Sequence, residues 1–189
     1  MKFIKSTMGA GKSAHLLISV YNHITTGKKP VLLKPNISSR SFEDNNNVTS
    51  RIDGLSRKID HILKPNETIK KLKVVKEGGT IFVDEAQFLT VHNVEELWKL
   101  SVERDVILYG LLTDSNGVLF TGTKRIIELT DKIEHIDHVC FFCGNNSNFT
   151  IRKKDDKYVF DLCDTYYIGD SEYTSVCKSC YIEKKEENK

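Results

Sequence analysis

The sequence has few of the residues that mark non-globular proteins. It contains only 3 Pro and 11 Gly among 189 residues and no internal repeat, which excludes collagen-like and proline-rich low-complexity chains. Its 28 Lys and Arg nearly cancel its 26 Asp and Glu, so neither a strongly basic nucleic-acid arm nor an acidic tail dominates. With 39% hydrophobic residues, these absences predict a soluble globular protein.

Long apolar segments are also missing. No run approaches the roughly 18 apolar residues of a membrane span. The apolar run in the first residues is too short for a signal peptide. We therefore expect a cytoplasmic protein without a membrane partner. The 5 cysteines would then lie in a reducing compartment, where paired cysteines indicate a metal site or catalysis more often than disulfides.

Strand-like and helix-like segments alternate along the first 138 residues. Strands are predicted at 2–5, 31–33, 80–83 and 106–112, and helices at 12–26, 62–75, 91–103 and 124–130. The polar residues 36–54 are predicted to form a mobile loop. This alternation is typical of an α/β domain in which helices flank a parallel sheet.

The junction between the first strand and the first helix carries a phosphate-binding pattern. Residues 6–13, Ser-Thr-Met-Gly-Ala-Gly-Lys-Ser, resemble the Walker A sequence, although Ser6 occupies its first glycine position. Small residues let backbone N–H groups point at phosphate oxygens, Lys12 would bind the β and γ phosphates, and Ser13 would bind Mg²⁺. The helix dipole adds a favourable field. The alternative is a glycine-rich turn that binds no ligand. A second nucleotide-binding motif further along the chain makes that alternative less favoured.

An acidic strand end provides that second motif. Residues 82–88, Phe-Val-Asp-Glu-Ala-Gln-Phe, resemble a Walker B strand, whose carboxylates emerge at the carboxyl edge of the sheet. Asp84 would hold Mg²⁺ through water, and Glu85 would orient a nucleophile and accept its proton. For this segment alone, an ordinary strand that ends in solvated acids is the alternative.

Two C-x-x-C pairs mark a second unit that begins near Val139. The paired cysteines are Cys140, Cys143, Cys177 and Cys180. The pairs favour a tetrahedral, structural zinc site, although the 33 residues between them, 144–176, exceed the 15–20 of a zinc ribbon. Redox pairs and unligated thiols are the alternatives. Cys163 is the odd cysteine and is predicted to be a buried apolar residue.

These motifs, in this order, resemble the type II thymidine kinases over nearly the whole chain, with the bacterial and large-phage members most similar. Residues 8–13 resemble the family's phosphate loop, and residues 82–88 resemble its F-x-D-E-A-Q-F signature. Residues 34–40, 109–122 and 173–177 resemble three further family segments. We therefore predict a P-loop NTPase-like α/β domain at 1–138, a zinc-binding lasso domain at 139–182 and a charged tail at 183–189.

The resemblance implies an ATP-dependent thymidine kinase. Such an enzyme transfers the γ-phosphate of ATP to the 5′-hydroxyl of thymidine and forms dTMP in pyrimidine salvage. The resemblance also implies Mg²⁺, a structural Zn²⁺, feedback inhibition by dTTP and a homotetramer. It implies a cytoplasmic location, in the host if a phage encodes the protein. Nucleic acid is not an expected partner.

The resemblance assigns site residues by position. Glu85 matches the catalytic base. Arg40 matches the arginine of the family's K-P-x-I-D-x-R segment, and we expect it to stabilise charge on the transferred group. The ATP and Mg²⁺ set is Ser6, Thr7, Met8, Gly9, Ala10, Gly11, Lys12, Ser13, Arg40, Asp84 and Gln87. The nucleoside set is Met8, Phe88, Leu111, Ser115, Phe120, Thr150, Tyr167 and Tyr173. The metal set is Cys140, Cys143, Cys177 and Cys180.

Three serines depart from the family pattern. Ser6 replaces a glycine, Ser38 replaces an aspartate near the phosphates, and Ser115 replaces an aromatic residue that packs on the base. Loss of such a stacking face costs about 1–3 kcal/mol. The first alternative function is therefore a catalytically impaired nucleotide-binding relative. A P-loop ATPase that acts on nucleic acid is the second, and the net charge of +2 weighs against it.

Overall fold

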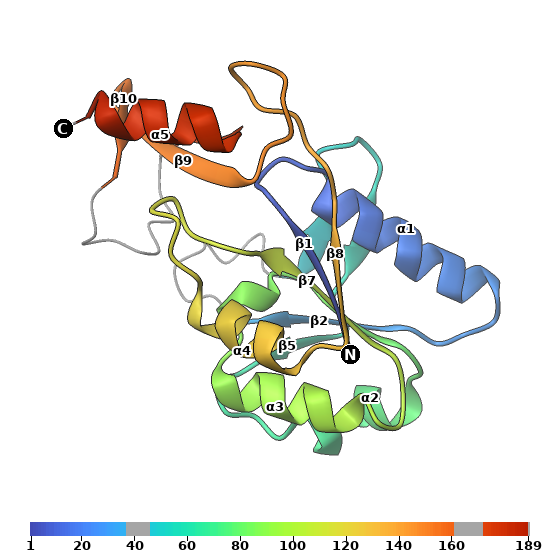
Figure 1. Cartoon of the computed structure of the whole chain (residues 1–189). Helices are drawn as coiled ribbons and strands as arrows, with labels where there is room; N and C mark the ends of the chain where they lie inside the picture. The colour runs from blue at the N-terminus through green and yellow to red at the C-terminus, as the bar shows by residue number, and fades with distance from the viewer. Residues whose placement is uncertain (37–45, 161–171, 189) are drawn as a thin grey trace.

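A computed structural model describes residues 1–36, 46–160 and 172–188. Its larger part is a twisted sheet with helices on both faces (Figure 1). A smaller part, drawn in orange and red, lies over one end of that sheet. The phosphate loop is at the same end, between the first strand and the first helix.

The central sheet has six parallel strands in the order β5-β2-β6-β7-β1-β8. The strands are β1 (Lys2–Ser6), β2 (Val31–Pro35), β5 (His61–Leu63), β6 (Ile81–Val83), β7 (Val106–Leu111) and β8 (Lys132–His135). Parallel neighbours need crossover connections, so helices cover both faces of the sheet. This is the P-loop NTPase-like α/β fold that the sequence predicted.

Two apolar cores hold the helices against the sheet. On one face, α1 (Lys12–Thr25) buries Leu16 in a core with Ile4. On the other face, α3 (Val91–Leu100) and α4 (Thr121–Leu129) bury Leu97 and Ile126 in a core with Phe3. The consecutive residues Phe3 and Ile4 enter different cores because successive side chains of a strand point to opposite faces.

The smaller part is an antiparallel sheet with one helix. Its strands follow the order β10-β9-β11, with β9 at Phe149–Lys154, β10 at Lys157–Val159 and β11 at Glu172–Val176. The helix α5 spans Lys178–Glu186, so four of the seven residues predicted as a charged tail are helical. Tyr181 of α5 stacks on Phe149, with ring centroids 4.7 Å apart.

Two sequence predictions about local structure were wrong. Residues 62–75 do not form one helix: β5 ends at Leu63, and the 3₁₀ turn η2 (Ile69–Lys71) and the short helix α2 (Lys73–Glu77) follow. Pro65 separates these pieces. The predicted loop at 36–54 contains β3 (Asn47–Thr49), which pairs with β4 (Ser56–Lys58). Residues 37–45, with Ser38, lie outside the described residues.

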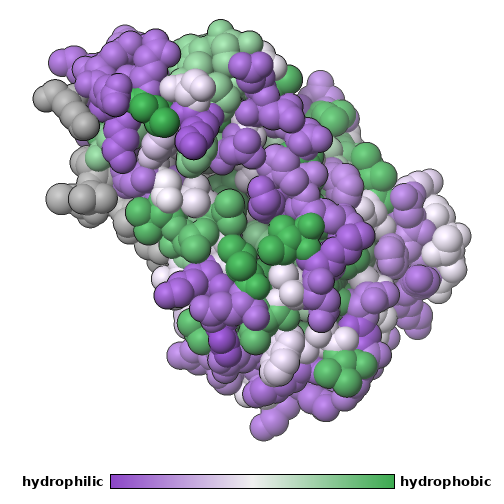
Figure 2. Space-filling view, viewed as in Figure 1, coloured by the Kyte–Doolittle hydropathy of each residue, from purple (hydrophilic) through white to green (hydrophobic). Residues whose placement is uncertain are grey.

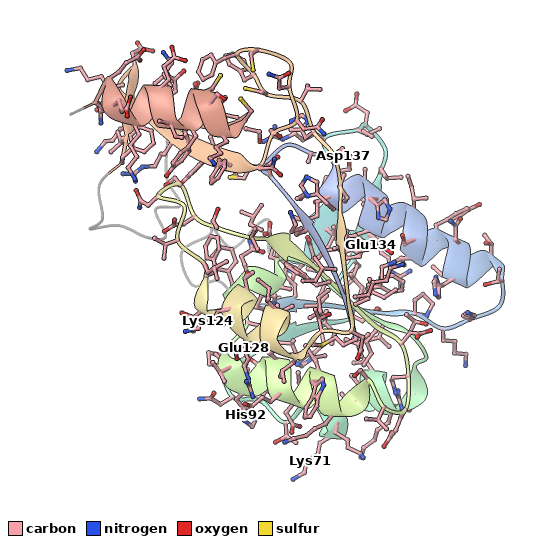
Figure 3. All side chains as sticks on the ribbon, viewed as in Figure 1. Lys71, His92, Lys124, Glu128, Glu134 and Asp137 are labelled. Atoms are coloured by element: carbon pink, nitrogen blue, oxygen red, sulfur yellow. The ribbon has the colours of Figure 1, made fainter. Side chains whose placement is uncertain are left out.

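The surface in the view of Figure 2 is mainly hydrophilic, with apolar side chains in small groups. Charged side chains such as Lys124 and Glu128 of α4 and Glu134 of β8 lie at the outside of the sheet-and-helix layers (Figure 3). Among the described residues, no helix is long and apolar enough to cross a membrane.

Candidate active site and metal centre

The phosphate loop connects β1 to α1 at the carboxyl edge of the sheet. Gly9 and Gly11 have φ values of 80° and 75°, which side chains rarely adopt, so both glycines serve the turn. Lys12 and Ser13 open α1, where free N–H groups and the helix dipole favour an anion. Ser6 is buried, and its hydroxyl has no hydrogen-bond partner among the described residues.

Two carboxylates follow β6 and lie beside this loop. Lys12 Nζ is 3.0 Å from Asp84 Oδ1 and 3.7 Å from Glu85 Oε2. All three side chains are largely shielded from solvent, with exposures of 10%, 4% and 16%. The structure therefore brings together three residues from two motifs that lie 72 positions apart in the sequence.

Glu85 has an unusual backbone and a fixed side chain. Its φ is 52°, in the left-handed region, and the 3₁₀ turn η3 (Ala86–Phe88) follows directly. The amide Nε2 of Gln87 donates a hydrogen bond to Glu85 Oε2 at 2.6 Å. Gln87 Oε1 accepts one from the backbone N–H of Leu111 at 3.1 Å, which fixes which end of the carboxamide faces Glu85.

Two glycines allow the strand β7 and the helix α4 to approach η3 closely. A Cβ at Gly110 would lie 2.8 Å from Gln87 Oε1, and a Cβ at Gly122 would lie 2.7 Å from the Gln87 carbonyl oxygen. The Thr123 hydroxyl donates to the Leu111 carbonyl at 2.8 Å. The turn that carries Glu85 is thus packed between two elements that leave it little freedom.

The predicted nucleoside residues are distributed over both parts of the molecule. Phe88 and Phe120 meet edge to face, with ring centroids 5.6 Å apart. The backbone N–H of Met8 donates to Thr150 Oγ1 at 3.5 Å. The carbonyl of Ser115 accepts a hydrogen bond from the Tyr181 hydroxyl of α5 at 3.3 Å.

Of the predicted site residues Tyr173, Tyr167 and Arg40, only Tyr173 lies within the described residues. Tyr173 is on β11, directly opposite Arg152 of β9. Tyr167 and Arg40 lie outside the described residues, and so does Cys163. The assignments of Tyr167 and Arg40 to the site stay predictions.

The four paired cysteines meet in one cluster that fits zinc. Their sulfur atoms lie within 4.8 Å of one another, and the sulfurs of Cys143 and Cys177 are 3.5 Å apart. A tetrahedral ion with Zn–S bonds of 2.3 Å places its sulfurs about 3.8 Å apart. Residues Cys140 and Cys143 precede β9, whereas Cys177 and Cys180 lie at the start of α5.

The thiols of the cluster differ in how readily they ionise. Burial opposes ionisation of Cys140, but N–H groups of Cys177, Cys143 and Phe142 outweigh it and lower the Cys140 pKa to about 6. Burial raises the pKa of Cys180 to about 12, and the neighbouring thiols act in the same direction. Four thiolates this close need a positive ion among them, which Zn²⁺ would supply.

Sequence reasoning missed two serines that contact the phosphate loop. Ser147 Oγ is 3.1 Å from Thr7 Oγ1, and Ser175 Oγ donates a hydrogen bond to the Met8 carbonyl. Ser147 lies four residues after Cys143. Ser175 lies two residues before Cys177, in the segment 173–177 that resembles the family, but that resemblance indicates no contact with the phosphate loop. Serines at such positions are too common to indicate a contact with a loop about 140 to 170 residues away.

Comparison with known proteins agrees with this geometry. The sequence model of the thymidine kinase family matches residues 1–181. The thymidine kinase of Enterobacteria phage T4 is 34% identical over 96% of this chain and 94% of its own length. That of Encephalitozoon cuniculi is 32% identical over 97% of this chain and 87% of its own. That of Salmonella typhimurium is 33% identical over 98% and 91%.

Proposed function

Since the chain belongs to the thymidine kinase family, we propose that it transfers the γ-phosphate of ATP to the 5′-hydroxyl of thymidine. The observation that carries this proposal is the group of Lys12, Asp84 and Glu85 beside the phosphate loop. A cation and two carboxylates at a helix N-terminus are the parts that phosphoryl transfer needs, because its catalysis consists of positioning and charge stabilisation.

The phosphate loop would bind the donor. Backbone N–H groups of residues 9–13 and the ammonium of Lys12 would face the β and γ phosphates. Ser13 and Asp84 would hold Mg²⁺, which neutralises phosphate charge when it is bound. Asp84 is suited to this role because its carboxylate is nearly buried at the end of β6, next to Lys12.

Glu85 would act as the general base. Its carboxylate accepts the proton of the 5′-hydroxyl as that oxygen forms a bond to the γ-phosphorus. The bond from phosphorus to the bridging oxygen breaks, and ADP leaves. Gln87 keeps the carboxylate in place during this step, since its own carboxamide is held by Leu111.

Phe88 and Phe120 would form an apolar wall for the base of thymidine, assisted by Met8, Leu111 and Thr150. We also propose that dTTP inhibits the enzyme, that it is a homotetramer and that it works in the cytoplasm without nucleic acid, as the resemblance implies. Zinc would be structural, because four cysteine ligands leave no open position for chemistry.

An ADP-release assay tests the proposal against both alternatives. We expect ADP to form only when thymidine is present, in an amount equal to the dTMP formed. ATP hydrolysis that DNA stimulates and thymidine does not would instead support the nucleic-acid ATPase. Binding of dTTP without turnover on any nucleoside would support the catalytically impaired relative. Neither the family match nor the curated relatives favour these two alternatives.

A further inference from the structure

Three hydroxyl groups of the zinc-binding unit, the described part of residues 139–182, contact the phosphate loop. Ser147 Oγ lies 3.1 Å from Thr7 Oγ1, and Thr150 Oγ1 accepts from the Met8 N–H at 3.5 Å. Ser175 Oγ donates to the Met8 carbonyl at 2.5 Å. Ser147, Thr150 and Ser175 are all buried, with exposures of 0%, 5% and 5%, so water does not compete freely for these bonds.

Two of these hydroxyls bind the same residue of the loop from neighbouring strands. Thr150 of β9 and Ser175 of β11 are directly opposite each other in the antiparallel pair. Side chains at such positions point to the same face and lie about 5 Å apart at Cβ. One accepts from the N–H of Met8 and the other donates to its carbonyl, so each of the two peptide groups that flank Met8 contacts a hydroxyl of this unit.

The chain segments that carry these hydroxyls are joined at the cysteine cluster. The Phe141 N–H donates to the Ser175 carbonyl, and the Asn148 N–H donates to the Val176 carbonyl, both at 3.0 Å. Ser175 is separated from Cys177 by only one residue. Backbone hydrogen bonds and the nearby cysteine cluster therefore restrain the segments that carry these hydroxyls.

We propose that Ser175, together with Thr150 and Ser147, is a positioning residue that holds the first half of the phosphate loop in the conformation that binds phosphate. This inference depends on the proposed function, in which the loop binds ATP. A loop whose N–H groups are already aligned loses less conformational entropy when the anion binds, so it binds the anion more tightly. The zinc-binding unit thus contributes to the ATP site as well as to the nucleoside pocket.

The direct test compares Ser175→Ala with Thr174→Ala, a change at the neighbouring position of β11, whose partner on β9 is Ile151. Titration calorimetry would measure binding of Mg·ATP, of inorganic tripolyphosphate with Mg²⁺, and of thymidine. We expect Ser175→Ala to weaken both phosphate ligands about five-fold, the factor for one lost hydrogen bond of ordinary strength. Thr174→Ala should leave both affinities unchanged.

Hydrogen exchange of the ligand-free protein provides a second readout. Peptides that cover residues 6–13 should exchange faster in Ser175→Ala than in the native chain, while peptides from α3 should not change. If Ser175→Ala loses zinc or fails to fold, Ser147→Ala tests the same proposal through Thr7. A loop that exchanges at the native rate in these variants, with native affinity for tripolyphosphate, would overturn the proposal.

The outcome also separates this inference from the proposed function. If the native chain binds neither Mg·ATP nor tripolyphosphate, the proposed function fails first. If the native chain binds both and Ser175→Ala binds them equally well, only the positioning role fails. A loss of thymidine affinity without any loss of phosphate affinity would also contradict it, because it would place the effect of Ser175 in the nucleoside pocket.

Discussion

The carboxamide of Gln87 donates a hydrogen bond to the carboxylate of Glu85 over 2.6 Å, and Gln87 is itself 2% exposed. Its other end is held by the backbone of Leu111 on β7. Glu85 also has a backbone conformation that non-glycine residues rarely adopt. Strain of this kind persists where the surroundings over-determine it, and it is concentrated at functional sites.

The change Glu85→Gln tests the general base. It keeps the size of the side chain and removes the group that accepts the proton, so turnover should fall by about 10²- to 10⁴-fold. Binding of ATP should remain close to native, because Lys12 and Asp84 are unchanged. Steady-state kinetics and calorimetry measure the two effects, and full activity in this variant would rule out the assigned role.

The change Gly110→Ala tests the packing around Gln87. The new methyl group would lie 2.8 Å from Gln87 Oε1 and 3.3 Å from the Phe3 ring. We expect a loss of about 1–3 kcal/mol of unfolding free energy from overpacking. A fall in kcat beyond the loss of folded protein should accompany it, because Gln87 must move. Gly79→Ala is the control, since its nearest atom would be 3.6 Å away; equal behaviour of the two variants would contradict the account.

The buried hydroxyl of Tyr109 should make the stability of the protein depend on pH in the alkaline range. Burial raises the pKa of its hydroxyl to about 12, from 10.0. The unfolded chain would lose this proton near pH 10 and the folded chain only near pH 12. The contribution of the protonated hydroxyl to the free energy of unfolding is therefore fully present below pH 10 and is lost as the pH rises to 12. The part due to Tyr109 is about 3 kcal/mol.

Denaturant titrations of the native chain and of Tyr109→Phe between pH 9 and 12 measure this contribution. The variant also loses hydrogen bonds to His15 and Ser19, so its stability at pH 9 should be lower than that of the native chain. Its decline toward pH 12 should be shallower. Parallel curves for the two proteins would show that the buried hydroxyl does not titrate as described.

Metal analysis tests the cysteine cluster. Elemental analysis should give about one zinc ion per chain, as expected of a site with four cysteine ligands. Cys177→Ser or a strong chelator should lower the melting temperature, because binding energy at such a site is folding energy. A metal-free protein that is fully folded, with native thermal stability, would refute the structural role of zinc.

Much of the fold could be predicted because its signals are local. Short apolar runs predicted β1, β6 and β7. The helical spacing of apolar residues predicted α1, whose apolar side packs toward Ile4. The phosphate loop and the acidic strand end were visible because their chemistry fixes residue types at close spacing. Parallel strands then bring Lys12 and Asp84 together at one edge of the sheet, as the α/β pattern predicted.

The features that could not be predicted from the sequence depend on contacts between residues far apart in the chain. Apolar residues such as Ile62 and Leu63 are compatible with either a helix or a strand. Pairing with β2 places them in the strand β5. The edge strand β8 has four residues, of which Lys132 and Glu134 are charged, so no apolar run predicted a strand there. Ser175 has no role that its own neighbours reveal, since its partner Met8 is 167 positions away.

Transfer of labelled phosphate from γ-labelled ATP to a panel of nucleosides measures the proposed reaction itself. We expect label to move to thymidine and form dTMP, transfer to purine nucleosides to be much slower, and Glu85→Gln to slow transfer by about 10²- to 10⁴-fold. Label released only as inorganic phosphate, or no transfer to any nucleoside by folded, zinc-loaded protein, would contradict the account.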